Sequence, residues 1–177
     1  MTLWLRFLWL LVCVWFRPRL GFTETSVLKG RVWPSDVDLN IHMNNAHYAA
    51  IMDLGRIDLM MRCGMWKLIL KNKLQAMVGA QMLRYRKGLR PFQPFQLETR
   101  LVCWDDRWLW IEQKFVTRKG VVACIAMVKT CFVDAAGVVD PSHIATMLGA
   151  DSGLRPPLPH WIESWNDVEV GALERKA

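Results

Sequence analysis

The feature that most constrains the fold is one long run of helical periodicity, residues 44–63, which lies between segments that alternate like β-strands. Apolar and small side chains recur along this run at helical spacing, and its length gives about five turns. Gly64 follows the run and is expected to end the helix. Gly55 lies inside it at a cost of about 1 kcal/mol relative to alanine, which indicates that the helix approaches a sheet closely.

Five other segments are expected to form strands, because apolar and polar residues alternate in them and turn signals separate them. These segments are residues 26–33, 76–87, 95–104, 108–117 and 121–133. Residues 66–74, which follow the long helix, are expected to form a short second helix or an irregular crossing. One strand, one long helix and four strands joined by tight turns predict an α+β fold, in which a curved antiparallel sheet wraps around the helix.

The composition is that of one globular domain. A chain of 177 residues, with 53% hydrophobic and 22% charged residues, can bury a core and is too short for two comfortable domains. A formal net charge of +7 favours anionic partners such as CoA, the phosphopantetheine of an acyl carrier protein (ACP) or anionic lipid. No basic run and no aromatic-basic motif is present, so nucleic acid is not expected as a partner.

The cysteines give no sign of a metal site or of disulfides. There are five, at positions 13, 63, 103, 124 and 131, with no Cys-x-x-Cys pair and no zinc-type spacing. We expect reduced, mostly buried thiols, which is typical of a protein on the cytosolic side of a membrane. Nothing near Cys63 in the sequence would lower its pKa, so it is a poor candidate for a nucleophile.

The first residues of the chain differ from the rest. Residues 3–16 are apolar except for Arg6, contain three tryptophans and precede Arg17 and Arg19. As a helix they span about 21 Å, which is less than the roughly 30 Å hydrocarbon core of a bilayer. No small-residue cleavage site is present, so a signal peptide is not expected. We favour a helix on the inner face of a membrane, and the alternative is a helix packed on the domain or on a dimer partner.

The sequence divides into residues 1–20, a membrane-associating segment, residues 21–140, the folded domain, and residues 141–177, a tail. Prolines at positions 156, 157 and 159 are expected to break any regular element in the tail. Its apolar residues Trp161, Ile162 and Trp165 suggest that it is held against the domain. Residues 171–177 are expected to be disordered.

The strongest functional signal is the stretch 35–48, which reads Ser-Asp-Val-Asp-Leu-Asn-Ile-His-Met-Asn-Asn-Ala-His-Tyr. Its first polar residues alternate with apolar ones, which predicts an extended segment with Asp36, Asp38, Asn40 and His42 on one side. Asp38 can act as a base or a nucleophile. Free N–H groups at the start of the following helix can hold an oxyanion.

This stretch resembles the hotdog-fold thioesterases, in particular the acyl-ACP and 4-hydroxybenzoyl-CoA thioesterase-like families, which carry Asp-x-Asn-x-His-Val-Asn-Asn before their central helix. The matching residues here are Asp38, Asn40, His42, Asn44 and Asn45, continued by Tyr48 and residues 53–56. A closer likeness is to the thioesterase-superfamily member 6 group, and it covers roughly residues 26–135. It is supported by residues 84–87, 94–95, 103–107 and 112–116.

The resemblance implies a hotdog fold, a homodimer or dimer of dimers whose sites have walls from two subunits, and hydrolysis of fatty acyl-CoA, acyl-ACP or related thioesters. It implies no metal and no cofactor. One departure favours an alternative, a catalytically inactive, membrane-associated protein that binds acyl thioesters or acts as a scaffold. Plant acyl-ACP thioesterases resemble this chain at Tyr85-Arg86-Lys87, but they place an acidic residue where this chain has Gly88. A hotdog dehydratase is less supported, because no histidine with a matching helix carboxylate is evident.

Each candidate residue has a structural interpretation as well. Asp38 is either the catalytic carboxylate or the cap of a turn, with Asn40 expected to orient it. His42 either polarises the substrate carbonyl or water, or is a structural histidine. Asn44 is a candidate helix N-cap, while N–H groups near Asn45 would form the oxyanion hole.

A second group of residues concerns substrate binding. Arg84 and Arg86, with Lys87 and Arg90, either dock CoA phosphates or an acidic carrier, or form an exposed strand face. Tyr48 is expected near the substrate. Several methionines, together with phenylalanines 92 and 95, either line an acyl tunnel or fill the core. The pair Asp53 and Arg56, three residues apart, is expected to form a helical ion pair or a subunit contact.

Overall fold

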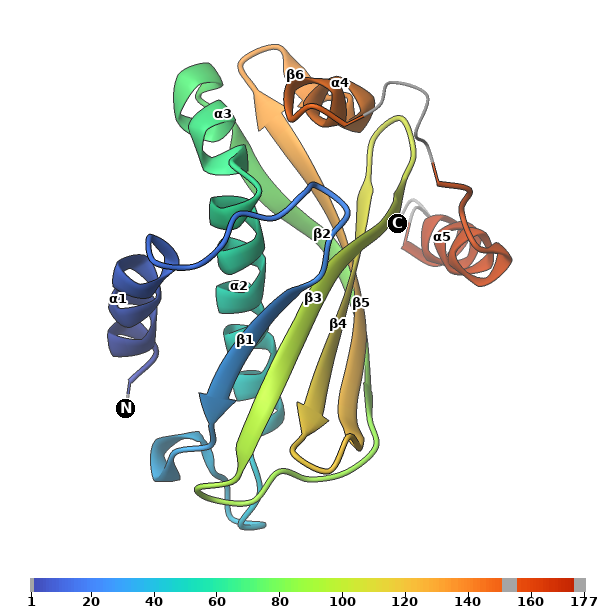
Figure 1. Cartoon of the computed structure of the whole chain (residues 1–177). Coiled ribbons are helices and arrows are strands. Elements are labelled where there is room, and N and C mark those ends of the chain that lie inside the picture. Colours follow the sequence, from blue (N-terminus) through green and yellow to red (C-terminus); the bar gives the residue numbers. More distant parts are fainter. Residues whose placement is uncertain (1, 151–155, 174–177) are drawn as a thin grey trace.

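The computed structural model describes residues 2–150 and 156–173. Its centre is a curved antiparallel sheet whose strands follow the order β1-β3-β4-β5-β2, with the short β6 paired to β5. The long helix α2, Asn45–Arg62, lies along the concave face of this sheet (Figure 1). A curved antiparallel sheet around one central helix is the hotdog fold, so the predicted fold class is confirmed.

The strands are β1 (Ser26–Arg31), β2 (Gln75–Tyr85), β3 (Pro94–Trp104), β4 (Leu109–Thr117), β5 (Val122–Asp134) and β6 (Gly137–Val139). The first five fall close to the predicted segments. Strand β6, which has three residues and is not among the predicted strands, follows a turn in which the Asp134 carboxylate accepts hydrogen bonds from the N–H groups of Ala136 and Gly137. Strands β1 and β2 are the two ends of the main strand order, so each leaves one edge without a neighbouring strand among the described residues.

Helix α2 forms as its periodicity predicts. The side chain of Asn44 accepts a hydrogen bond from the N–H of Ala46 at 2.9 Å, which confirms it as the N-cap. A Cβ added at Gly55 would lie 2.6 Å from the Thr99 hydroxyl of β3, so the close approach to the sheet is also confirmed. Gly64 has a φ of +83°, and its left-handed conformation separates α2 from the short helix α3, Met65–Asn72.

A buried polar network joins α2 to the sheet. The amide nitrogen of Gln113, on β4, donates to the carbonyl of Met52 at 2.9 Å and to the Thr99 hydroxyl at 3.0 Å. The guanidinium of Arg56 donates to the amide oxygen of Gln113 at 2.8 Å. Burial lowers the pKa of Arg56, and the nearby Asp53 partly offsets this effect. Because buried polar groups are costly unless they are hydrogen-bonded, this network fixes the register of α2 on the sheet.

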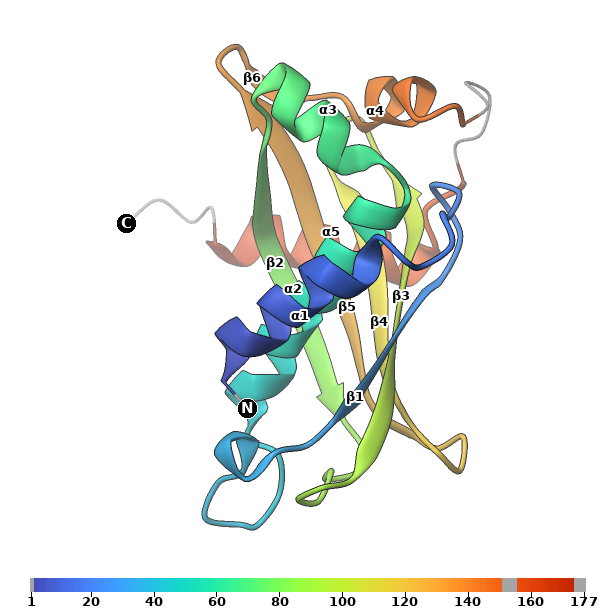
Figure 2. The ribbon, with the colours of Figure 1, turned by 60° about the vertical axis from the view of Figure 1, so that its left-hand side comes forward.

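The N-terminal helix α1, Leu3–Val14, packs against α2 on the side away from the sheet (Figures 1 and 2). Leu10 and Val14 are buried in this contact. The guanidinium of Arg6 binds the carboxylate of Asp36. The packing of α1 on the domain, one of the two interpretations of this segment, is therefore confirmed.

The opposite face of α1 is exposed and apolar. Its exposed large side chains are Leu3, Trp4, Leu5, Leu8, Trp9 and Val12, followed by Trp15 and Phe16. In the described part of the chain, no helix combines the length and the apolar content that crossing a bilayer requires. Contact of residues 3–16 with a membrane surface stays a prediction.

The tail forms two helices, α4 (Pro141–Met147) and α5 (His160–Leu173), so the expectation that prolines break every regular element there is wrong. The prolines at 156–159 precede α5 and do not interrupt it. Helix α5 crosses the face of the sheet opposite α2 (Figure 1). Ile162 is fully buried there, and Trp165 packs edge-on against Trp110 of β4, which confirms that the tail is held against the domain. Of the residues expected to be disordered, 171–173 belong to α5 and 174–177 lie outside the described residues.

Candidate functional site

The predicted extended segment at the start of the motif is wrong. Residues Pro34–Asp36 form a single 3₁₀ turn, and the chain then makes a closed loop in which Val37 pairs only with Met43. Ile41 has a φ of +55°. The alternation does not produce a strand, because short polar side chains in this stretch bond to nearby backbone and stabilise turns. We call residues 37–43 the motif loop.

Asp36 holds the motif loop in place and lies apart from the other polar residues. Its buried carboxylate binds Arg6 of α1 and accepts a hydrogen bond from the N–H of Trp33 at 2.8 Å. The Nδ1 atom of His47 lies 3.4 Å from it. The backbone carbonyl of Asp36 accepts from the N–H of Asn44 at 2.8 Å. Asp36 therefore joins α1, the motif loop and the start of α2.

Asp38 lies within the motif loop and is half-buried. One carboxylate oxygen, Oδ1, accepts a hydrogen bond from the backbone N–H of Asn40 at 2.9 Å. The side chain of Asn40 is exposed, so it is the Asn40 backbone that contacts the carboxylate here. Within residues 2–150 and 156–173, Asp38 forms no ion pair. The carboxylate thus caps a turn through Oδ1 without being neutralised by a cation.

His42 packs against the connection between β2 and β3. A Cβ added at Gly88 would lie 2.4 Å from Cδ2 of the His42 ring. The adjacent residue Leu89 accepts a hydrogen bond from the N–H of Met43 at 2.8 Å, which holds the motif loop against this connection. An acidic side chain at position 88 would displace the imidazole. The departure from the related pattern therefore has a structural consequence: Gly88 leaves room for His42.

Tyr48 lies in the first turns of α2 and is buried among aromatic rings. Its ring packs edge-on against Phe115 and Tyr85, with centroids 4.9 Å and 5.3 Å away. Burial raises the pKa of Tyr48 to about 12, so its hydroxyl is neutral at physiological pH. The Tyr85 hydroxyl donates to the carbonyl of Asn45 at 3.4 Å, which ties β2 to the helix N-terminus.

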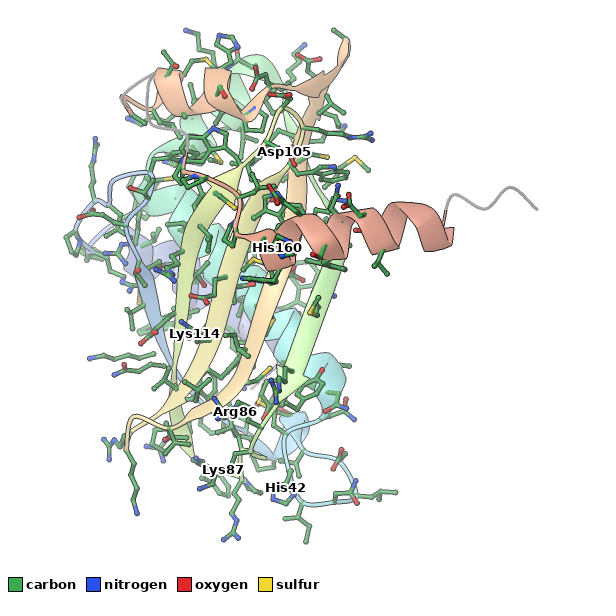
Figure 3. All side chains as sticks on the ribbon, turned by 90° about the vertical axis from the view of Figure 1, so that its right-hand side faces the viewer. His42, Arg86, Lys87, Asp105, Lys114 and His160 are labelled. Atoms are coloured by element: carbon green, nitrogen blue, oxygen red, sulfur yellow. The ribbon has the colours of Figure 1, made fainter. Side chains whose placement is uncertain are left out.

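The basic residues at the end of β2 and in the connection that follows it lie at the same end of the molecule as the motif loop. Figure 3 shows His42, Arg86 and Lys87 gathered at this end of the sheet. The backbone N–H groups of Arg86 and Lys87 both donate to the carbonyl of Ala123, which fixes their position, while their side chains are exposed. Arg84 and Arg90 are exposed as well. The structure therefore brings a cationic surface beside the motif loop.

An apolar cavity of about 350 Å³ opens between the second half of α2 and the sheet, and we call it the α2 cavity. Three methionines line it, Met60, Met65 and Met77. Asp53 is the only acid in its lining, and it pairs there with Arg56. The ion pair was predicted and is confirmed, but its place at a cavity was missed. The cavity face of α2 carries residues 53, 56, 57 and 60. Their helical spacing is the sequence signal that could have identified this face.

Asp38 and the α2 cavity lie at different ends of the central helix. The motif loop adjoins the N-terminus of α2, whereas the cavity is lined by helix residues from Asp53 onward. Within one chain the candidate carboxylate therefore does not face the cavity. In the same described ranges, no group of three His, Cys, Asp or Glu side chains is placed to hold a metal ion.

Comparison with known proteins places these features in a family. The family model described as the thioesterase-like superfamily matches residues 32–165. This range includes the motif loop, α2 and the strands β2 to β6. The chain belongs to the thioesterase-like superfamily. Protein THEM6 of Drosophila melanogaster is 31% identical over 157 residues, covering 86% of this chain and 78% of that protein.

Other relatives agree with this assignment. A probable thioesterase of Saccharomyces cerevisiae is 28% identical over 119 residues, covering 66% of this chain and 51% of the yeast protein. Protein THEM6 of Danio rerio is 34% identical over 125 residues, with 70% of this chain and 62% of that protein covered. The chain thus spans less than two thirds of the length of these two relatives.

Solved structures support the fold. The probable thioesterase YbaW from Escherichia coli superposes with a TM-score of 0.65 at 14% identity, covering 69% of this chain and 94% of that one. A hypothetical protein from Staphylococcus aureus, solved in complex with CoA, gives a TM-score of 0.63 at 15% identity, with 90% and 98% covered. At these identities the likeness establishes the hotdog architecture.

Proposed function

We propose that this protein hydrolyses fatty acyl thioesters of CoA or ACP, with Asp38 as general base or nucleophile. The observation that carries this proposal is the motif loop. Arg6, Asp36 and Leu89 hold it against the N-terminus of α2, so that the loop carrying Asp38 and His42 adjoins the first turn of this helix. The similarity to named thioesterases supports the same chemistry.

The proposed reaction uses each of these groups. As a base, Asp38 takes a proton from water while the water oxygen attacks the thioester carbonyl carbon. Negative charge then develops on the carbonyl oxygen, and the N–H of Asn45 in the first turn of α2 stabilises it, with His42 as a second donor. The C–S bond breaks and the thiolate receives the proton from Asp38, which releases thiol and carboxylic acid. Removing one oxyanion donor typically costs about 3 kcal/mol of barrier.

The basic surface beside the motif loop fits the other part of the substrate. CoA and the phosphopantetheine arm of ACP both carry phosphate, and exposed guanidinium and ammonium groups bind phosphate well. Arg84, Arg86 and Lys87 would hold this phosphate while the thioester reaches Asp38. The docking role of these residues is part of the proposal.

The acyl chain is proposed to occupy the α2 cavity of a second subunit. Strand β2 has a free edge, and it exposes apolar side chains including Met77, Val78 and Met82. If two copies pair antiparallel through β2 near Ala80, residues 76–78 of one copy lie beside residues 82–84 of the other. The cavity of one subunit, lined in part by residues 76–78, then approaches the motif loop of the other.

The exposed apolar face of α1 suggests where the enzyme works. Tryptophans and leucines on one helix face are typical of contact with the interfacial region of a bilayer. We include in the proposal that this face lies on a membrane surface, which would place the active site close to lipid-derived substrates.

A matched pair of variants tests the catalytic part. Asp134 caps its turn as Asp38 does, because its Oδ1 accepts from the N–H of the residue two positions later. Asparagine preserves such a turn, so Asp38→Asn removes the base and keeps the loop. Release of free thiol is measured on a panel of acyl-CoA and acyl-ACP substrates. We expect Asp38→Asn to lose at least about 100-fold in kcat and Asp134→Asn to retain full activity.

The alternative is an inactive protein that binds acyl thioesters, which the glycine at position 88 favours. Wild-type protein that binds acyl-CoA and releases no thiol would support this alternative. Full activity of Asp38→Asn would instead show that the hydrolase uses another carboxylate, for which Asp53 in the α2 cavity is the first candidate.

A further inference from the structure

A second cavity lies between α1, α2 and the edge strand β1, and we call it the α1 cavity. Its volume is about 430 Å³, which is within the range of small-molecule sites, about 300 to 1,000 Å³. Helix α1, strand β1 and helix α2 all contribute to its lining. It shares no lining residue with the α2 cavity, so the two are separate sites.

Most of the lining of the α1 cavity is apolar. The apolar side chains are Trp9, Leu10, Cys13, Val27, Leu28, Trp33, Ile51, Leu54 and Phe95. The ring of Phe95 packs against the backbone of Gly30, where an added Cβ would lie 2.5 Å from the ring. This lining suits an alkyl chain, whose transfer from water releases about 25 cal/mol for each Å² of apolar surface buried.

Every charged residue in the lining of the α1 cavity is a cation: Arg6, Arg17, Lys29 and Arg31. Two of them are held by buried acids, since Arg6 binds Asp36 and Arg17 binds Asp58. The other two are exposed and have no acidic partner within the described residues. The cavity therefore keeps an excess of positive charge beside an apolar wall.

The unpaired cations lie on the open edge of β1. The carbonyl of Val27 accepts a hydrogen bond from Arg17, and the carbonyl of Arg31 accepts one from Arg6 at 3.4 Å. These two arginines attach α1 to the strand at two points four residues apart. Lys29 lies between them, and its ammonium makes no ion pair or hydrogen bond with any described residue. The side chain of Arg31 donates to the carbonyl of Phe92 at 3.2 Å and has no other hydrogen-bond partner among the residues that the structure describes.

We infer that the α1 cavity binds a single-chain anionic amphiphile, with its head group on Lys29 and Arg31 and its alkyl chain along Leu10, Leu28 and Phe95. The shared chemistry is a carboxylate or phosphate monoester on an alkyl chain. A charged head group gains hydrogen bonds from the two unpaired cations, and the apolar wall covers the chain. This site is additional to the proposed thioester site, because it involves neither the motif loop nor the α2 cavity.

Two half-buried cysteines report on the two cavities. Cys13 lines the α1 cavity and Cys63 lines the α2 cavity, while the other three cysteines are buried. The full-length protein is alkylated with N-ethylmaleimide, and the rates at the two thiols are followed by mass spectrometry. Three probes with the same chain are compared below their critical micelle concentrations: myristate, myristoyl lysophosphatidate and the neutral myristyl alcohol. Protection by myristate alone identifies a carboxylate ligand, and protection by lysophosphatidate alone identifies a phosphate monoester.

We expect at least one anionic probe to slow alkylation of Cys13 by about tenfold at a concentration where the alcohol has little effect. Lys29→Glu with Arg31→Glu is expected to weaken this protection by at least about tenfold. The control variant is Arg118→Glu with Lys119→Glu, in the exposed turn after β4, which changes the net charge by the same amount. We expect it to leave the protection of Cys13 unchanged. Three results would overturn the inference: equal protection by the alcohol, no effect of the Lys29 and Arg31 reversal, or protection of Cys63 in place of Cys13. Circular dichroism of each variant verifies the fold.

Discussion

The ring of His42 lies directly against the backbone of Gly88, so that any side chain at position 88 would begin 2.4 Å from Cδ2 of the imidazole. These residues are far apart in the sequence, and the contact joins the motif loop to the connection between β2 and β3. Real Cβ atoms do not approach a ring carbon this closely. A substitution at position 88 must therefore move His42 or the loop that carries it.

We accordingly predict that Gly88→Ala displaces His42 and lowers kcat for thioester hydrolysis by about tenfold or more, because an oxyanion donor is lost. Thiol release under saturating substrate measures this effect. Gly171→Ala on α5 is the control, because a Cβ there meets nothing within 4 Å. Unchanged kcat in Gly88→Ala would show that His42 serves the fold and not the reaction.

The elements that the sequence predicted well depend on local patterns. Alternation along β3 buries Phe95, Leu97 and Thr99 on one face, and helical spacing with an asparagine cap defines α2. The motif loop has alternation too, yet it is not a strand. Asp38 bonds to the backbone of Asn40 two residues away, and a pattern of residue types does not reveal whether such local bonds will outweigh pairing with another strand.

The surroundings of the site depend on contacts between residues distant in the sequence. Arg6 reaches Asp36 and Arg17 reaches Asp58, across 30 and 41 residues. A basic residue beside an apolar helix also fits a membrane anchor, so the sequence did not distinguish the two roles of α1. The α2 cavity likewise forms between α2 and four strands of the sheet, β2 to β5, and no local pattern specifies the space left between them.

Asp58 is predicted to be the acid on which stability depends most. It is fully buried and binds Arg17, Ser26 and Arg62. Asp58→Asn leaves these cations without a counter-charge and is expected to lower the free energy of unfolding by about 3 kcal/mol. Urea denaturation followed by circular dichroism measures this change.

The matched control is Asp53→Asn, the same substitution on the same helix. The Asp53 side chain is 60% exposed, so its pair with Arg56 is screened by solvent. We expect a loss of about 1 kcal/mol or less. Equal losses in the two variants would contradict the special role of Asp58.

Stability is predicted to fall in alkaline solution because of a buried thiol. Burial raises the pKa of Cys124 from 9.0 to about 12 in the folded protein. Between these values an unfolded chain loses this proton and the folded chain keeps it, so the free energy of unfolding falls as pH rises. One such group contributes up to about 1.4 kcal/mol for each pH unit.

Cys124→Ala tests this pH dependence. The variant loses packing and is less stable than the wild type at pH 8, but its stability is expected to decline less steeply above pH 9. Urea denaturation under reducing conditions at several pH values gives both slopes. Parallel slopes would show that Cys124 is not responsible. Burial also raises the pKa values of other groups, among them Cys103, to about 11, and Tyr48, to about 12, and these groups are expected to contribute to the decline that remains.

The free edge of β2 is predicted to hold two copies together. Edge strands pair with other chains unless charge or a covering element prevents it, and β2 exposes Met82 and neighbouring apolar residues. In the antiparallel pair centred near Ala80, residue 82 of one copy lies beside the exposed Val78 of the other, so a lysine there would replace an apolar contact with a charge at both ends of the pairing. We expect Met82→Lys to halve the mass measured by sedimentation velocity.

Val138→Lys on the short β6 is the control for this experiment, because Val138 and Met82 are similarly exposed, at 44% and 43%. Its mass is expected to match that of the wild type. A monomeric wild type at micromolar concentration, or an unchanged mass in Met82→Lys, would refute pairing through β2.

The outward face of α1 is predicted to bind membranes containing anionic lipid. Deleting residues 1–20 would not test this cleanly, because it would also remove the arginines that bind the buried Asp36 and Asp58. Trp4→Ser with Phe16→Ser changes only residues that are 74% and 87% exposed. Losing this apolar area is expected to weaken partitioning into vesicles by about tenfold or more, as sedimentation with phosphatidylserine-containing vesicles measures.

Trp161→Ser with Val168→Ser, on α5, removes exposed apolar residues elsewhere and is expected to leave partitioning unchanged. Equal binding by both double variants and the wild type would mean that another surface, or no surface, contacts the membrane.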